Sequence, residues 1–126
     1  MSQVPEDLRY TKTHEWMKAD GAAVTVGITD FAQKQLTDIV YIDLPKVGVS
    51  KKEGEVLLTV ESVKSAEDVF TPVSGEITAV NSSLSDNPEL INKDSYSNWI
   101  VRIKPTEDIK SKGMSPDEYR KFIGEN

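Results

Sequence analysis

The most informative segment of the chain for its fold covers residues 56–69 and reads Val56-Leu57-Leu58-Thr59-Val60-Glu61-Ser62-Val63-Lys64-Ser65-Ala66-Glu67-Asp68-Val69. Apolar residues at both ends predict two short β-strands, over residues 56–60 and 69–73, with the polar segment 61–68 between them. This pattern is typical of a β-hairpin and places Lys64 near the tip. A lysine there offers a primary amine to another protein while the strands on both sides stay rigid. On this segment alone, a solvated charge is the favoured interpretation, because the chain has 15 Lys and Arg residues.

Short strands separated by turn-forming residues recur along the rest of the chain. Ala23–Ile28 alternates with a period of two, which places Val24, Val26 and Ile28 on one face. Strands at such spacing favour a sandwich or small barrel over βαβ units. We therefore predict a mostly β fold of short antiparallel strands, as a single domain over residues 1–126 with its core at about 10–104. The remaining strands are expected over residues 39–44, 76–80 and 99–103.

The helices are expected to be short and peripheral. Ser115 lies before Pro116 and three residues before Glu118, which is the pattern of a capping box with proline at the first helical position. The C-terminal helical segment should cover about residues 106–126. Its apolar stripe would be Tyr119, Phe122 and Ile123, a first short helix is expected over residues 106–112, and Thr29-Asp30 should cap another that carries Phe31 and Leu36.

Composition excludes several classes of function. A chain of 126 residues can bury a core without disulfides or metal. The absence of cysteine excludes thiolate catalysis and most structural zinc sites, and the single histidine, His14, excludes a site built on two histidines. The net charge of −6 argues against binding to nucleic acid or to an anionic membrane surface. No apolar run is long enough to cross a bilayer.

Catalytic motifs are also missing from the sequence. It contains neither a Gly-x-Ser-x-Gly elbow nor a glycine-rich phosphate loop. Adjacent acids such as Glu67 and Asp68 point to different sides of the chain and are more often solvated than catalytic. His14 is expected to be a surface or half-buried histidine beside an aromatic ring. We therefore predict a protein that is not an enzyme and holds no metal.

Several blocks of sequence, taken in order, resemble the H protein of the glycine cleavage system over almost the whole chain. No single block would be specific, but their order makes coincidence a poor explanation. The blocks are Tyr10-Thr11-Lys12-Thr13-His14-Glu15-Trp16, the segments 26–33, 38–48, 60–69 and 72–77, and the positions Asn81, Leu84, 88–92, Tyr96 and Trp99.

The resemblance implies a lipoyl-domain-like barrel-sandwich hybrid in which Lys64 carries covalent lipoate on a swinging arm. In that family a pyridoxal-phosphate-dependent glycine decarboxylase (P protein) loads an aminomethyl group on the arm. A tetrahydrofolate-dependent aminomethyltransferase (T protein) unloads it, and a flavin-containing dihydrolipoyl dehydrogenase (L protein) reoxidises the dithiol. The cofactor supplies the chemistry, and the protein supplies binding, orientation and reach.

The resemblance also implies the roles of residues around the lysine. The loaded arm carries a cationic amine, which needs acceptor groups when it is sheltered from water. Glu61 and Glu67 are expected to help a lipoylating enzyme recognise the hairpin. The shelter would be lined by Thr13, Glu15 and Asp68, with Ile28 as an apolar wall, and the modification motif would be Glu61, Ser62, Val63, Ser65 and Glu67.

The sequence departs from the family pattern at several positions. Thr37 stands where a glycine is usual before Asp38, so the backbone angles of that turn are expected to differ. Gln35 occupies a position where some members carry a histidine near the arm. Asp94-Ser95 and Ser97-Asn98 replace a usual proline and usual glycines. These changes leave the lysine motif whole and affect the expected geometry of the cleft and of the surface near Trp99.

Three readings of the lysine remain open at this stage. The favoured one is a carrier in glycine catabolism and one-carbon metabolism, monomeric and located in the bacterial cytoplasm rather than processed in mitochondria. A second is another swinging-arm domain, although a biotin carrier would show methionines where Val63 and Ser65 stand. A third is a module whose Lys64 stays bare, or a lipoyl relay that serves other lipoate-dependent complexes.

Overall fold

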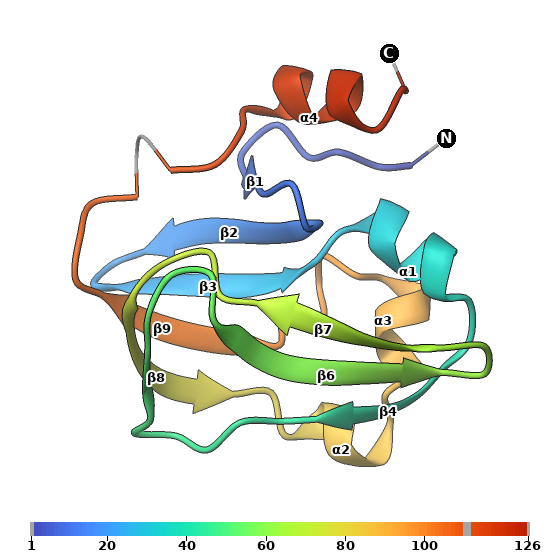
Figure 1. Ribbon diagram of the computed structural model, residues 1–126, viewed down its shortest axis with the longest axis horizontal. Coiled ribbons are helices and arrows are strands. Elements are labelled where there is room, and N and C mark those ends of the chain that lie inside the picture. The colour runs from blue at the N-terminus through green and yellow to red at the C-terminus, as the bar shows by residue number, and fades with distance from the viewer. Residues whose placement is uncertain (1, 110–111, 126) are drawn as a thin grey trace.

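Two antiparallel β-sheets form the body of the protein in a computed structural model that describes residues 2–109 and 112–125 (Figure 1). The six-stranded sheet has the order β1-β2-β3-β9-β8-β5, and the three-stranded sheet has the order β4-β6-β7. The mostly β prediction is confirmed. The strands are β1 Arg9–Tyr10, β2 Glu15–Asp20, β3 Ala23–Ile28, β4 Ile39–Asp43, β5 Ser50–Lys51, β6 Val56–Ser62, β7 Ala66–Phe70, β8 Gly75–Val80 and β9 Val101–Pro105.

The main hydrophobic core lies between the two sheets. Val24, Val26 and Ile28 are all buried, as their alternation predicts, and they pack in one cluster with Val60 and Val69 of the smaller sheet. Because each sheet buries one face and leaves the other to solvent or to a covering helix, outward-facing residues of the smaller sheet, such as Glu61 and Glu67, stay exposed.

A second, smaller core covers the outer side of β1 and β2. The C-terminal helix α4 (Pro116–Phe122) lies over these strands together with the N-terminal segment (Figure 1). Its predicted capping box is present, with Ser115 and Glu118 as the two reciprocal partners. Tyr119 is fully buried and stacks on Tyr10 with ring centroids 4.7 Å apart, whereas Phe122 stays exposed. The predicted apolar stripe therefore docks mainly through Tyr119.

The expected helix over residues 106–112 is not formed by its described part, and residues 110–111 lie outside the described chain. Thr106 donates its N–H to the Ser74 carbonyl at 3.0 Å, and Ile109 is buried in the main core. These two anchors hold the segment in an irregular path. Three other short helices are α1 Asp30–Leu36, capped by Thr29 as predicted, α2 Ser83–Asp86 and α3 Leu90–Lys93.

The hairpin is longer and its turn tighter than the sequence predicts. Strand β7 begins at Ala66 and ends at Phe70, so the predicted strand over residues 69–73 is shifted toward the tip. A bulge between Val56 and Leu58 interrupts the alternation of β6, so that Leu57 and Leu58 are both buried and Val56 is 41% exposed. A second bulge in β4 exposes both Val40 and Tyr41 for the same reason.

Thr37 adopts the backbone conformation that a glycine would take at this position. Its φ of 62° and ψ of −145° lie in a region that β-branched residues rarely occupy. Local hydrogen bonds compensate: the Thr37 N–H donates to the Gln33 carbonyl at 3.0 Å, and Asn92 Nδ2 donates to the Thr37 carbonyl at 2.8 Å. The turn therefore keeps a glycine-like geometry in spite of the threonine.

The segment before Trp99, where the sequence departs from the family pattern, forms a turn that the Asp94 carboxylate stabilises. Asp94 Oδ1 accepts the N–H groups of Tyr96 and Ser97 at 3.0 and 3.1 Å, and the hydrogen bonds from Ser97 lower the pKa of Asp94. Trp99 is half-buried, with the Arg102 guanidinium 4.2 Å from its ring centroid. The departures from the family pattern thus retain an ordered turn.

Candidate functional site

The lysine turn is held by its own backbone and one serine. Ser62 donates its N–H to the Ser65 carbonyl at 2.7 Å. The Ser62 hydroxyl accepts the N–H groups of Lys64 and Ser65 at 3.3 and 3.1 Å. Val63 donates its N–H to the Asp38 carbonyl at 3.0 Å, which ties the turn to the segment before β4. The backbone of the tip is therefore fixed while the side chains of Val63 and Lys64 stay exposed.

The side chain of Lys64 is exposed and carries no hydrogen bond or ion pair within the described residues. It borders a cavity of about 360 Å³, which we call the lysine pocket. One wall is β6 and β7, and the other is α1 with the end of β3. The lining residues are Thr13, His14, Ile28, Phe31, Ala32, Gln35, Leu36, Val60, Lys64, Ser65, Glu67, Asp68 and Val69.

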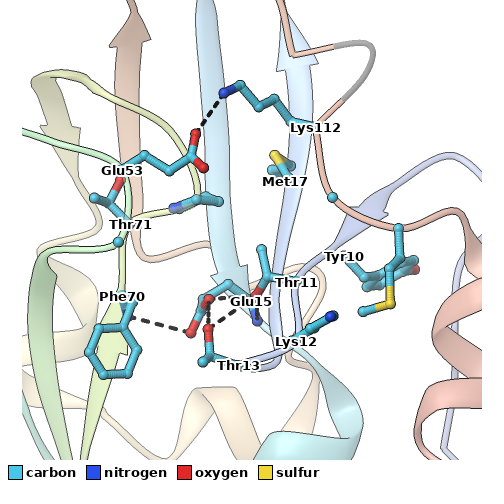
Figure 2. A pocket seen from close by; sticks show the side chains of 14 residues that line it. Tyr10, Thr11, Lys12, Thr13, Glu15, Met17, Glu53, Phe70, Thr71 and Lys112 are labelled. Atoms are coloured by element: carbon cyan, nitrogen blue, oxygen red, sulfur yellow. Dashed lines mark hydrogen bonds and ion pairs between the residues drawn. The ribbon is translucent and has the colours of Figure 1, made fainter.

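A buried carboxylate lies farther along the same side of the molecule. Glu15 is 1% exposed, and its Oε1 accepts the hydroxyls of Thr11 and Thr13 at 2.6 and 2.5 Å (Figure 2). Its Oε2 faces the Phe70 N–H at 3.4 Å. Burial raises the pKa of Glu15, and these three hydrogen bonds oppose that rise.

Glu15 opens on a second cavity, of about 560 Å³, which we call the glutamate pocket. At its far end Lys112 Nζ donates to Glu53 Oε1 at 2.7 Å (Figure 2). This ion pair connects the turn before β6 to the segment before α4. The lining residues are Tyr10, Thr11, Lys12, Thr13, Glu15, Met17, Glu53, Gly54, Phe70, Thr71, Pro72, Lys112, Gly113 and Met114.

The four predicted cleft residues are divided between the two pockets. Ile28 and Asp68 line the lysine pocket, Glu15 lines the glutamate pocket, and Thr13 lines both. Strand β7 continues from Asp68 in one pocket to Phe70 in the other, a span of about 7 Å at the usual rise per residue. Asp68 is exposed and accepts the Thr59 hydroxyl at 3.2 Å, so the two predicted acids have unlike surroundings.

The residues of the predicted modification motif have separate positions on the hairpin. Glu61 is exposed and lies opposite Ala66 in the β6–β7 ladder. Glu67 and Ser65 border the lysine pocket, and Val63 is 64% exposed at the tip. Ser62 forms the turn, a structural role that the sequence pattern did not assign to it.

Two contributors to the carboxylate site were not predicted from the sequence. Thr11 both donates to Glu15 and accepts the Glu15 N–H at 3.0 Å, and its place two residues before Thr13 was a usable signal. Phe70 contributes only its backbone N–H. No side-chain pattern can reveal such a donor.

His14 is half-buried, as expected, and it lies between three aromatic rings. The imidazole centroid is 4.8 Å from Phe31 and 5.9 Å from Phe122. Its Nδ1 is 2.8 Å from the hydroxyl of Tyr119, which also lies 2.7 Å from the Thr29 hydroxyl. Burial lowers the pKa of His14. A neutral imidazole therefore faces the lysine pocket at neutral pH.

The arrangement suits a guest with an apolar chain and a cationic end. Ile28, Val60 and Val69 give the lysine pocket apolar walls, and the oxygens of Thr13 and Glu15 are acceptors beyond it. Among the described residues, no group of three or more His, Asp or Glu side chains is placed to hold a metal ion. None of the helices in residues 2–109 and 112–125 has the length and apolar character needed to cross a membrane.

Comparison with known proteins gives a consistent result. The family model described as Glycine cleavage H-protein matches residues 8–126. The probable glycine cleavage system H protein of Picrophilus torridus is 58% identical over 125 residues, which cover 99% of this chain and 100% of that protein. The glycine cleavage system H protein of Rubrobacter xylanophilus is 47% identical over 126 residues, covering 99% of this chain and 98% of that one.

A solved structure is similar over nearly the full length. The crystal structure of a glycine cleavage system H protein from Mycobacterium marinum superposes with a TM-score of 0.87 at 37% identity. It covers 96% of this chain and 99% of that chain. The predicted fold class, a lipoyl-domain-like barrel-sandwich hybrid with short peripheral helices, is confirmed.

Proposed function

Because the chain belongs to the glycine cleavage H-protein family, we propose that it is the lipoyl carrier of that system and that Lys64 is its attachment residue. One observation carries the assignment of the lysine. The Lys64 amine lies at the tip of an ordered hairpin, has no partner among the described residues, and borders a pocket with apolar walls. A lipoylating enzyme can reach such an amine without unfolding the domain.

The residues present fit a lipoyl group. When bound through an amide to Lys64, lipoate supplies the sulfurs that hold the aminomethyl group. Ile28 and Val69 would contact its aliphatic chain, because they give the lysine pocket an apolar surface. Asp68 and Thr13 would guide the polar end, since both line the lysine pocket and Thr13 also lines the glutamate pocket.

Glu15 is the acceptor that we assign to the cationic amine of the cargo. A cation removed from water needs a paired acid, and Glu15 is a buried carboxylate with hydroxyl donors already fixing its position. In the unloaded protein, burial works against its charge, as the raised pKa shows. A nearby ammonium would favour the ionised form of Glu15. Because water solvates this buried carboxylate poorly, the carboxylate would bind the ammonium more strongly than an exposed acid would.

The wider role follows from the family. We propose that this single lipoyl-carrier domain is not catalytic and acts as a monomer in the cytoplasm. It would receive the aminomethyl group at the glycine decarboxylase and deliver it at the aminomethyltransferase. Its sulfurs would be reoxidised at the dihydrolipoyl dehydrogenase. Glu61 and Glu67 remain our proposed contacts for the lipoylating enzyme, because both are exposed beside the tip.

Intact-mass measurement tests the attachment residue. Protein produced in a lipoate-supplied host should gain the mass of one lipoyl group, and Lys64→Arg should lose that gain completely. Lys52→Arg is the matched control, because Lys52 is also an exposed lysine in a turn between strands. A mass gain that persists in Lys64→Arg would move the attachment to another lysine and would overturn the proposal.

A second measurement separates the carrier from a lipoyl relay. Lipoylated protein mixed with a glycine decarboxylase should support exchange between bicarbonate and the glycine carboxyl group, and Lys64→Arg should not. A lipoylated chain that supports no exchange but passes its lipoyl group to other proteins would favour the relay.

A further inference from the structure

One buried hydroxyl connects two of the segments that line the lysine pocket, the 11–15 turn and α1. The Tyr119 hydroxyl lies 2.8 Å from His14 Nδ1, in the turn formed by residues 11–15. It also lies 2.7 Å from the hydroxyl of Thr29, the N-cap residue of α1. The turn presents Thr13 to the pocket, and α1 presents Phe31. The 11–15 turn and α1 are therefore joined through a residue of the C-terminal helix.

The hydrogen bonds form a chain with one consistent direction. The Thr29 hydroxyl accepts the Ala32 N–H at 3.2 Å and can donate to the Tyr119 oxygen. The Tyr119 hydroxyl can then donate to His14 Nδ1, provided that this nitrogen carries no proton. Every group in the chain is satisfied when His14 is neutral.

The backbone conformation of His14 links the position of its imidazole to the positions of Thr13 and Glu15. His14 has a φ of 70°, in the left-handed region that non-glycine residues occupy at a cost, and its carbonyl accepts the Thr29 N–H at 3.0 Å. Thr13 and Glu15 flank it directly. A shift of the imidazole would move both acceptor residues, because a left-handed residue between them sets the direction of each side chain.

We propose that Tyr119 is a positioning residue of the lysine pocket, whose hydroxyl fixes the 11–15 turn against α1 and so sets the distance between Thr13 and the α1 residues that line the pocket. This inference rests on the proposed function. Tyr119 itself does not line either pocket, and it acts only through His14 and Thr29.

Several titratable groups surround His14 and contribute to the pH dependence of the pocket. Glu15 adjoins it in the turn, and Lys64, Glu67 and Asp68 of the hairpin line the same pocket. From α4 only Tyr119 titrates near it, and burial raises the pKa of that hydroxyl, which keeps its proton. The residues that α1 contributes to the pocket do not titrate. Protonation of His14 removes the Nδ1 acceptor and reverses the hydrogen-bond chain.

Spontaneous loss of cargo is the main test. Water attacks the aminomethyl carbon, the C–S bond breaks, and thiol, formaldehyde and ammonium are released. Protein lipoylated and then loaded by a glycine decarboxylase is freed of the enzyme, and formaldehyde is followed. Tyr119→Phe should lose cargo about threefold to tenfold faster, which is the usual weight of one hydrogen bond. The ring stack on Tyr10 is retained in this variant.

Tyr96→Phe is the matched control. The Tyr96 hydroxyl accepts the Asp30 N–H at 3.1 Å and donates to the Gln3 carbonyl, so it contacts α1 but not the 11–15 turn. Its loss of cargo should equal that of the wild type. Equal acceleration in both variants would overturn the inference, because any lost tyrosine hydroxyl on α1 would then suffice.

The pH profile separates positioning from general stabilisation. The ratio of the Tyr119→Phe rate to the wild-type rate should fall toward one as pH drops below the depressed pKa of His14. A ratio that does not change with pH would overturn the inference. Should Tyr119→Phe fail to fold, His14→Asn provides the same test, since asparagine tolerates the left-handed backbone and lacks the imidazole.

Unmodified protein offers a readout that needs no cofactor. In amide NMR spectra, Tyr119→Phe should shift resonances in both the 11–15 turn and α1, at Thr13 and at Gln35, whereas Tyr96→Phe should shift those of α1 and of the N-terminal segment near Gln3 but not that of Thr13. Intact mass identifies a different failure. Wild-type protein that gains no lipoyl or cargo mass would overturn the proposed function itself, whatever the spectra show.

Discussion

The lysine turn and the 11–15 turn are built in opposite ways. Residues 62–65 form a tip held by short-range bonds, chiefly those of the Ser62 hydroxyl, and Lys64 stays exposed. Residues 11–15 form a turn whose carboxylate is buried. Besides its own Thr11 and Thr13, this turn is supported by distant elements, β7 through Phe70 and α4 through Tyr119. One turn presents a group to solvent, and the other removes a group from it.

The two turns meet different structural requirements of a carrier. An attachment residue has to be reached by an enzyme, so its turn needs rigidity without burial. A shelter for a cation has to exclude water, so its acid is desolvated before any guest arrives. We expect substitutions in the 11–15 turn to change cargo retention, and substitutions in the lysine turn to change modification.

The largest expected effect is at Glu15. Glu15→Gln should speed the loss of cargo about 10- to 100-fold, the weight of a buried hydrogen bond to a charged group. Asp68→Asn should speed it by no more than about fivefold, because Asp68 is exposed and its charge is screened. The release of formaldehyde from loaded protein measures both rates.

The unmodified protein supplies the control for Glu15. Burial already raises the pKa of this carboxyl, so Glu15→Gln should leave the free energy of unfolding unchanged or slightly increased near neutral pH. Equal effects of the two substitutions on cargo loss would contradict the contrast between a buried and an exposed acid. Equal effects would mean that the amine of the cargo contacts Glu15 and Asp68 equally.

A smaller effect is expected in the lysine turn. Ser62→Ala removes the acceptor of two backbone N–H groups and should lower the free energy of unfolding by about 1 kcal/mol. The rate of lipoylation should fall a few-fold, since the tip becomes less ordered, whereas cargo retention should not change. Urea unfolding and timed intact-mass measurement provide the readouts. Ser65→Ala is the control, and an equal loss there would dismiss the role of the Ser62 hydroxyl.

A substitution at Thr37 tests the segment that anchors the lysine turn through Asp38. It precedes Asp38, whose carbonyl accepts the Val63 N–H. Thr37→Gly should raise the free energy of unfolding by about 1 kcal/mol, because relief of the backbone strain exceeds the entropic cost of glycine. Thr37→Ala keeps a Cβ and should show no gain. A gain in both variants would point to the side chain and not to the backbone angle.

Much of the lysine turn could be predicted from the sequence, and little of the 11–15 turn could. The hairpin is local: two apolar stretches and a polar segment lie within one window, so Lys64 at its tip follows from periodicity. The departure from regular pairing there is local too, since a bulge between Val56 and Leu58 interrupts the alternation of β6. The predicted second strand of the hairpin began too late, at residue 69. Residues 66–68 have the polar composition of a turn, but they pair with β6 as part of β7.

The carboxylate site could not be derived in that way. Its parts come from the first turn, β7 and the C-terminal helix, and their approach depends on how the sheets pack. The sequence alone left Glu15 as one acid among 21 acidic residues, and the family resemblance singled it out. The capping box at Ser115 predicted α4 correctly, but nothing in that pattern indicates that Tyr119 reaches His14.

The smallest expected effect concerns two neighbours whose pKa values move in opposite directions. Burial raises the pKa of Glu15 above its ordinary 4.5, so the folded state holds that proton more tightly than the unfolded chain. Its contribution to stability is present below pH 4.5 and is lost as pH rises through the folded-state pKa. Burial lowers the pKa of His14 below 6.5, so its contribution is present above pH 6.5 and is lost as pH falls toward the folded-state pKa. Urea unfolding of unmodified protein from pH 4 to 8 should show that Glu15→Gln removes the first slope and His14→Asn the second. Slopes of the same sign would contradict the burial of one of these groups.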